Sequence, residues 1–239
     1  MYNLHISMDD TKGIFKALSS GTFQSIFDTR TLNFLRRMHQ LYGTKFNLFC
    51  TCVDGTFKLG KVPEIYRDEF IKNASWLMFG FHCYSEDMCY QQVTKKSFLQ
   101  QYNYFQKQIL RITGQEKQLD VLRIHGFQGN KEICKELRNK GVKILLAADD
   151  QRKSYYLDEK LTERLNETGT CYDDNIDIKF VKSCTRLEKL DNISKELNQK
   201  LADGNELIPI FTHEWQMDKE EIRNKVEICC KWGENHGLC

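Results

Sequence analysis

The sequence has little proline, no long run of charge of one sign and no long apolar stretch. Its two prolines leave no room for a proline-rich linker. The 35 basic and 33 acidic residues are interspersed and give a net charge of only +2, which argues against nucleic acid as a partner. The longest apolar runs, such as Ile144 to Ala148, are far shorter than the roughly 20 residues of a membrane-spanning helix, so we expect no membrane partner.

The N-terminal region shows no signal-peptide pattern, because Asp9 and Asp10 interrupt it before an apolar segment forms. The ten cysteines include no CxxC pair, which argues against a zinc ribbon or a thioredoxin-type motif. Disulfide-rich secreted domains usually belong to much shorter chains. We therefore expect a cytoplasmic protein with reduced thiols.

Hydrophobic residues make up 41% of the 239-residue chain and aromatic residues 12%, as in folded globular proteins. Seven β-strand patterns alternate with helical patterns, which favours an α/β fold with mostly parallel strands and right-handed crossovers. Seven units suit a (β/α)7 barrel better than an open sheet, although periodicity alone does not separate the two. We expect residues 1–239 to form one domain. The predicted strands span residues 2–8, 45–52, 76–81, 119–124, 142–147, 176–181 and 207–211, and the main helices residues 22–42, 97–113, 130–139, 193–201 and 219–232.

Polar side chains follow most of the predicted strands at their C-terminal ends, where parallel α/β barrels carry their functional groups. Each has an ordinary alternative role: the Asp pair as a helix cap, the histidines as hydrogen-bonded core or loop residues, the later Asp pair as a solvated turn. One metal or proton-transfer site would explain all of them together. The polar residues at the strand ends are Asp9 and Asp10 after the first strand, His82 and Glu86 after the third, His125 after the fourth, Asp149 and Asp150 after the fifth, and His213 after the seventh.

A metal site gives these residues a common chemistry. His82 and Glu86 lie four residues apart and converge on one ion if a helical turn follows the third strand, and Asp10 then completes a three-ligand face. Such an ion keeps open positions for water and substrate, polarises a carbonyl and lowers the pKa of the bound water. Asp9 is placed to accept the proton of that water, and His213 to donate a proton to the leaving group.

At these residues the sequence resembles the polysaccharide deacetylase (NodB-homology, carbohydrate esterase family 4) superfamily. The family's first motif ends in an Asp-Asp pair and is matched by Ser7-Met8-Asp9-Asp10. The resemblance implies Asp9 as catalytic base and Asp10 as metal ligand. The second motif, His-Ser/Thr-x-x-His after a glycine, is similar to the segment from Gly80 to Glu86. The resemblance implies a distorted (β/α)7 barrel of the polysaccharide deacetylase and glycoside hydrolase type, which removes acetyl groups from amino sugars with a divalent metal.

Three later segments correspond to the family's remaining motifs in the same order, so the resemblance extends over essentially the whole chain. Arg123-Ile124-His125-Gly126 faintly resembles the third motif, Arg-Pro-Pro-x-Gly, which makes Arg123 a candidate catalytic residue. Asp149, or Asp150, is the candidate for the aspartate that tunes the catalytic histidine. Phe211-Thr212-His213 resembles the last motif, Leu-x-His, which implies His213 as the general acid.

The sequence departs from the family where Glu86 stands in place of the second metal histidine, and Asp87 is an alternative ligand. Two carboxylates and one imidazole would weaken the ion as a Lewis acid and favour harder metals such as Mn²⁺ beside Zn²⁺, with Co²⁺ and Ni²⁺ as further candidates. The proline pair of the third motif is also missing, and His125 there is a candidate substrate-binding residue.

The leading hypothesis is a metal-dependent hydrolase of an amide or ester on a carbohydrate-type substrate. A second hypothesis is a non-catalytic carbohydrate-binding barrel, in which Tyr84 and Trp215 stack on sugar rings. A third is a glycoside hydrolase-like enzyme that uses a carboxylate pair such as Asp9 with Asp149. The sequence predicts no oligomeric state.

Overall fold

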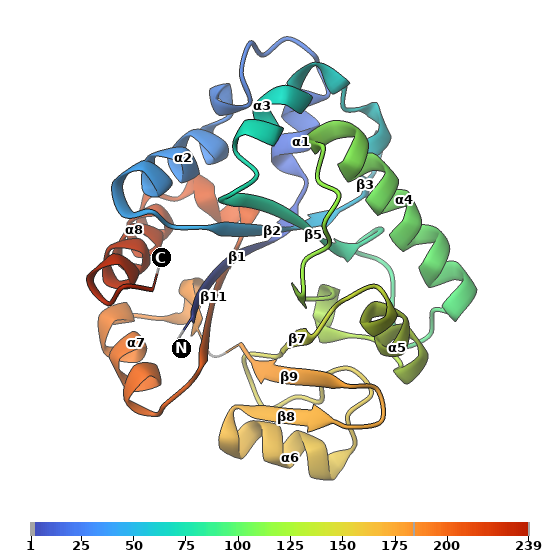
Figure 1. The fold of residues 1–239 in the computed structure, drawn as a ribbon, viewed down its shortest axis with the longest axis vertical. Coiled ribbons are helices and arrows are strands. Elements are labelled where there is room, and N and C mark those ends of the chain that lie inside the picture. The colour runs from blue at the N-terminus through green and yellow to red at the C-terminus, as the bar shows by residue number, and fades with distance from the viewer. Residues whose placement is uncertain (1–2, 184, 239) are drawn as a thin grey trace.

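The computed structural model describes residues 3–183 and 185–238, and its fold is α/β, as predicted. Figure 1 shows the strands through the middle of the molecule and the helices around them. The seven predicted strands correspond to β1 (Asn3–Thr11), β2 (Phe46–Thr51), β5 (Leu77–Cys83), β6 (Val121–Leu122), β7 (Ile144–Ala147), β9 (Ile178–Lys182) and β11 (Leu207–His213). Shorter or added strands are β3 (Val53–Asp54), β4 (Phe57–Lys58), β8 (Thr170–Asp173) and β10 (Thr185–Arg186).

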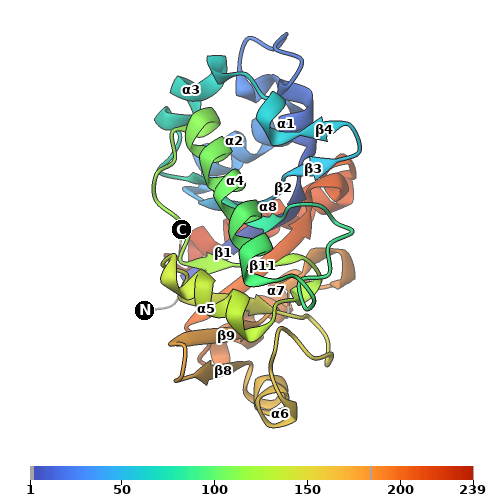
Figure 2. The ribbon, with the colours of Figure 1, turned by 90° about the vertical axis from the view of Figure 1, so that its right-hand side faces the viewer.

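The helices are α1 (Gly13–Leu18), α2 (Arg30–Tyr42), α3 (Arg67–Lys72), α4 (Lys95–Thr113), α5 (Lys131–Asn139), α6 (Glu159–Thr168), α7 (Ile193–Ala202) and α8 (Glu220–Asn235). The helix predicted for residues 22–42 begins only at Arg30, because Ser25 and Asp28 form a capping box around a short 3-10 turn and Thr29 is extended. Figure 2 shows α6 and β8 at one end of the molecule and α1 and α3 at the other.

The strands form two sheets, with the orders β10-β11-β1-β2-β5 and β6-β7-β9-β8. Neighbouring strands in these two sheets are parallel except β8 and β9. From β11 through β1, β2 and β5, and on to β6, β7 and β9, the strands follow the order expected of a seven-unit barrel. Among the described residues, the hydrogen-bonded ladder is interrupted between the two sheets, on the β5–β6 side and on the β9–β10 side.

Gly80 allows β6 to pack against β5 where the ladder is interrupted. A Cβ atom at this position would lie 2.7 Å from Leu122 Cδ2, 2.8 Å from Phe49 Cδ1 and 2.9 Å from Leu119 Cδ1. Distances this short leave no room for a methyl group. The two sheets therefore meet through side chains that fill the space above the glycine.

Side chains alternate between the two faces of each central strand. On β5, Phe81 packs on α4 through Phe98 and Tyr102, with ring centroids 5.9 and 5.4 Å apart. His82, the next residue, points instead to the interior between the sheets, where its ring contacts the backbone of Arg123. The same alternation on β1 turns Ser7 and Asp9 toward that interior.

Most of the cysteines lie in this core. Seven of the eight that the structure describes are buried, and Cys184 and Cys239 lie outside the described residues. Within residues 3–183 and 185–238, no helix combines the length and the apolar character needed to span a membrane.

Candidate active site

The first strand ends in an irregular turn that separates its two carboxylates. The register between β1 and β2 shifts between Met8 and Thr11, and Asp10 adopts a left-handed backbone conformation with φ of 54°. Non-glycine residues rarely adopt this conformation, and strand irregularities of this kind re-aim side chains beside functional sites. Asp9 consequently faces the buried Arg123, and Asp10 faces His82.

Three donor atoms converge beside this turn. Asp10 Oδ1 lies 3.3 Å from His82 Nε2 and 3.5 Å from His125 Nδ1, and the two ring nitrogens lie 3.3 Å apart. Asp10 Oδ1 is buried and forms no hydrogen bond of acceptable geometry within the described residues. We call Asp10, His82 and His125 the triad.

The donor set and its spacing suit a metal ion. Ligand atoms about 2.0–2.1 Å from a tetrahedral zinc ion lie about 3.3–3.4 Å from one another, close to the three separations of the triad. His82 Nδ1 lies 2.7 Å from the carbonyl oxygen of Arg123, so this nitrogen carries the proton and Nε2 presents its lone pair. Two imidazoles and one carboxylate also leave at least one position open for a substrate.

Charge within the triad is mutually stabilised. Burial alone would raise the pKa of Asp10, but the nearby rings of His125 and His82 hold it well below the ordinary value. Burial alone would lower the pKa of His82, but the carboxylates of Asp9 and Asp10 raise it above the ordinary value. The cluster therefore favours a positive charge at its centre, which a proton or a metal ion can supply.

Glu86, predicted as the third ligand, does not join the triad. Its carboxylate forms an ion pair with Lys12, and Asp87 accepts a hydrogen bond of 3.0 Å from Ser85. The predicted spacing required a helical turn after the third strand. In the structure His82 lies within β5, and the chain continues in a bend after that strand. Glu86, four positions later, therefore lies away from His82. His125, predicted only to bind substrate, lies where the third ligand was expected.

Arg123 fixes the other carboxylate of the turn. The guanidinium is fully buried, donates hydrogen bonds of 2.8 Å to Asp9 and 3.1 Å to Ser7 through Nη1, and donates one of 3.2 Å to Ser183 through Nη2. Its Cζ atom also lies 4.0 Å from the centroid of Phe211. Because the ion pair is buried, it holds Asp9 in one orientation next to Asp10.

His213 lies at the end of β11, opposite Asp9 in the register with β1. Its Nδ1 lies 3.0 Å from Glu188 Oε1, and its Nε2 lies 3.1 Å from Arg186 Nη2. A guanidinium only donates, so Nε2 accepts in this arrangement and Nδ1 carries the proton that Glu188 accepts. Burial would raise the pKa of Glu188, but the hydrogen bonds from His213 and its neighbours lower it to about 2.

Asp149 and Asp150, the predicted partners of His213, have other partners. Asp149 is bound by Lys189 at 2.7 Å and lies 3.7 Å from Arg186, and Asp150 pairs with Arg152. The carboxylate beside His213 is Glu188, in the 3-10 turn Leu187–Lys189 after β10. The sequence analysis missed Glu188. The signal for it was its position shortly after the sixth strand, on the rim where the other polar residues lie.

The triad, Asp9, Arg123 and His213 line one small cavity of about 160 Å³ at the C-terminal ends of the strands. Trp215, with 56% of its surface exposed, stands beside it, and its ring centroid lies 5.7 Å from that of His213. Tyr84 is turned toward Tyr104, with ring centroids 5.7 Å apart, and does not line this cavity. The residues that line it are Asp9, Asp10, His82, Arg123, Ile124, His125, Gly126, Phe127, Arg152, Arg186 and His213.

No protein-family model and no curated protein matches the sequence. Solved structures do match over nearly the whole chain. A putative polysaccharide deacetylase from Mycobacterium smegmatis is 9% identical, with a TM-score of 0.58 over 95% of this chain and 83% of its own. A mutant of a carbohydrate esterase family 4 pseudoenzyme from Bacillus anthracis, with restored enzymatic activity, is 10% identical, with a TM-score of 0.54 over 98% of this chain.

A 4-alpha-glucanotransferase from Thermococcus litoralis is also similar, with 11% identity and a TM-score of 0.58 over 95% of this chain. The present chain spans 63% of the length of the pseudoenzyme mutant and 37% of that of the glucanotransferase. At these identities the likeness establishes the fold. The chain has the fold of polysaccharide deacetylases, as its motifs predict.

Proposed function

We propose that this chain is a metal-dependent hydrolase that removes an acyl group from a carbohydrate-type substrate. The observation that carries the proposal is the convergence of Asp10 Oδ1, His82 Nε2 and His125 Nδ1, at separations of 3.3 to 3.5 Å, around an otherwise unpartnered buried oxygen. The triad would hold Zn²⁺, or alternatively Co²⁺, Ni²⁺ or Mn²⁺. The deacetylase fold supports the choice of substrate class.

A divalent ion in the triad would polarise the acyl carbonyl and lower the pKa of a bound water. Asp9 would act as the base, because it lies beside Asp10 and is held by Arg123 without itself belonging to the triad. The buried guanidinium holds Asp9 in place beside the same small cavity.

His213 would protonate the leaving amine or alcohol. Glu188 orients the ring through Nδ1, so that Nε2 faces the cavity. Arg186 has to leave Nε2 before that nitrogen can carry a proton, because both groups would then be donors. Substrate binding would therefore have to displace Arg186.

The test measures release of acetate or a longer carboxylate from a panel of N-acyl and O-acyl sugars. It compares Zn²⁺-loaded protein with chelator-treated protein. We expect turnover only with metal. His82→Ala should abolish it, whereas Glu86→Ala, which alters a neighbouring carboxylate outside the triad, should retain it. Chelator-insensitive hydrolysis, or equal activity in the two variants, would exclude the proposed role of the triad.

A non-catalytic carbohydrate-binding barrel is the second candidate. The contact between Arg186 and His213 Nε2 favours it, since the nitrogen that would donate a proton is already an acceptor. Binding of acylated sugars with no product released by wild-type protein or by Arg186→Ala would support this candidate over the hydrolase.

A further inference from the structure

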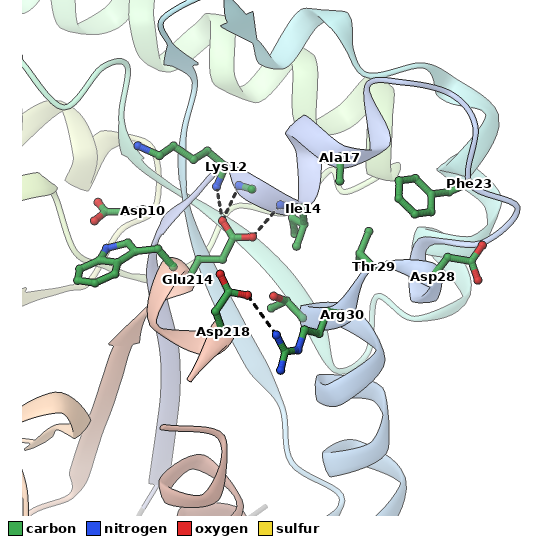
Figure 3. A pocket seen from close by; sticks show the side chains of 13 residues that line it. Asp10, Lys12, Ile14, Ala17, Phe23, Asp28, Thr29, Arg30, Glu214 and Asp218 are labelled. Atoms are coloured by element: carbon green, nitrogen blue, oxygen red, sulfur yellow. Dashed lines mark hydrogen bonds and ion pairs between the residues drawn. The ribbon is translucent and has the colours of Figure 1, made fainter. Parts of the chain in front are cut away.

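A second and larger cavity adjoins the triad. It has a volume of about 400 Å³ and lies between α1, the segment before α2 and the 3-10 helix Glu214–Asp218. Figure 3 shows Asp10 at one end of its lining and Phe23 at the other. Asp10 lines both this cavity and the smaller one, and Trp215 of the larger cavity contacts His213 of the smaller. The two cavities therefore share Asp10 as a common wall and lie side by side at the triad.

Glu214, a charged residue of the lining, is occupied by the backbone of α1. Its carboxylate accepts hydrogen bonds from the backbone N–H groups of Lys12, Gly13 and Ile14 at 2.8, 2.6 and 2.7 Å (Figure 3). The Lys12 ammonium pairs with Glu86. Neither charge is left for a ligand.

The remaining charged groups of this lining either bind the neighbouring backbone or lie mostly exposed at its edge. Asp28 accepts from the backbone N–H groups of Gln24 and Ser25 at 3.0 and 2.9 Å, and Arg30 lies 3.7 Å from Asp218. Asp10 itself faces the histidines of the triad. A sugar ring in this cavity would lose its hydrogen bonds to water and find few replacements, which is costly.

The uncharged part of the wall is mainly hydrocarbon. Ile14, Ala17, Phe23 and the Trp215 indole contribute it, and Ile14 is buried. A cavity of about 400 Å³ is within the range that binds small organic ligands. Its surface suits an alkyl chain, which gains free energy from leaving water without requiring polar partners.

We propose that this cavity, the acyl-chain cavity, receives the hydrocarbon chain of the substrate's acyl group, so that the substrate carries an acyl group longer than acetyl. The inference rests on the proposed function. In the reaction, water oxygen bonds to the acyl carbon and the bond from that carbon to the sugar nitrogen or oxygen breaks. The sugar takes up a proton, and the medium-chain carboxylate leaves from the acyl-chain cavity.

The test compares N-acetyl-, N-butyryl- and N-octanoylglucosamine, by calorimetric binding and by product release, with and without Zn²⁺. We expect affinity to rise by up to about fourfold per methylene until the cavity is filled. Ala17→Leu, which fills the cavity from α1, should lower the preference for octanoyl over acetyl by at least about tenfold. Ala202→Leu, an exposed change on α7, should keep the wild-type preference.

Thermal unfolding shows whether Ala17→Leu folds. Trp215→Ala removes part of the cavity wall independently, and should likewise lower the preference for octanoyl over acetyl. If the chain binds no metal but still binds longer acyl chains more tightly, the acyl-chain cavity is retained and the hydrolase is refuted. Metal-dependent hydrolysis with no preference between acetyl and octanoyl would refute the acyl-chain cavity and retain the hydrolase.

Discussion

His5 provides a quantitative test of the interior that holds Arg123. Its side chain lies on β1, two residues before Ser7, and stacks on Phe49 with ring centroids 6.1 Å apart. Neither ring nitrogen hydrogen-bonds another residue within the described chain. Burial, and then the nearby Arg123 guanidinium, lower the pKa of His5 from 6.5 to about 3. The folded protein therefore keeps this imidazole neutral in mild acid.

The sign of the effect on stability follows from proton binding. Below pH 6.5 the unfolded chain binds a proton at His5 that the folded protein does not, so the free energy of unfolding falls by about 1.4 kcal/mol per pH unit. The loss reaches about 2 kcal/mol at pH 5. It reaches about 5 kcal/mol near pH 3, where the folded protein also binds the proton.

Urea denaturation of wild type and His5→Phe at pH 8, 7 and 5 measures this loss. Phenylalanine keeps the stacking on Phe49 and has no titratable group, so the variant should lose about 2 kcal/mol less than wild type between pH 7 and pH 5. Between pH 8 and pH 7 the two proteins should change equally, which serves as the internal control. Equal losses down to pH 5 would refute a neutral, unpartnered His5.

Three further substitutions test other contacts. Glu188→Gln removes the charge that orients and stabilises a protonated His213, and should lower kcat by about 10²-fold or more in product-release assays. Asp9→Ala leaves Arg123 buried without its partner, and should lower the free energy of unfolding by about 3–5 kcal/mol in urea titrations as well as abolish turnover. Gly80→Ala should cost about 1–3 kcal/mol by overpacking where the two sheets meet, as measured by the urea midpoint.

The strand order and much of the rim were predictable, because both depend on local patterns. Apolar strands of four to eight residues followed by polar residues mark the C-terminal ends of parallel strands. Asp9, Asp10, His82 and His213 were found in this way, and the structure brings them around one cavity. The motif resemblance added an order for the segments that periodicity alone does not supply.

The third donor of the triad was not predictable by the same reasoning. The choice of Glu86 assumed that a helical turn follows β5, and whether a strand continues into a bend depends on contacts made far away in sequence. One such contact is the hydrogen bond of 2.8 Å that the Val53 N–H donates to the Tyr84 carbonyl oxygen. His125 reaches the triad from the turn after β6, where only the three-dimensional arrangement places it near His82.

Glu188 was missed for a related reason. Its partner His213 lies 25 residues later in the chain, and β10, the two-residue strand that precedes it, is too short to show a pattern. Asp149 was the natural choice because it ends a clear apolar strand, yet Lys189 and Arg186 bind it instead. Pairings between loops depend on how the strands pack, which sequence spacing does not encode.

Metal binding tests the central claim most directly. The experiment dialyses purified wild type, His125→Ala and Glu86→Ala against Zn²⁺ at neutral pH and measures the bound metal. The result distinguishes the triad from the ligand set with Glu86 that the motifs predict. We predict one tightly bound ion per chain in wild type and in Glu86→Ala, and its loss in His125→Ala. An ion retained by His125→Ala but lost in Glu86→Ala, or no ion in wild type, would contradict the account.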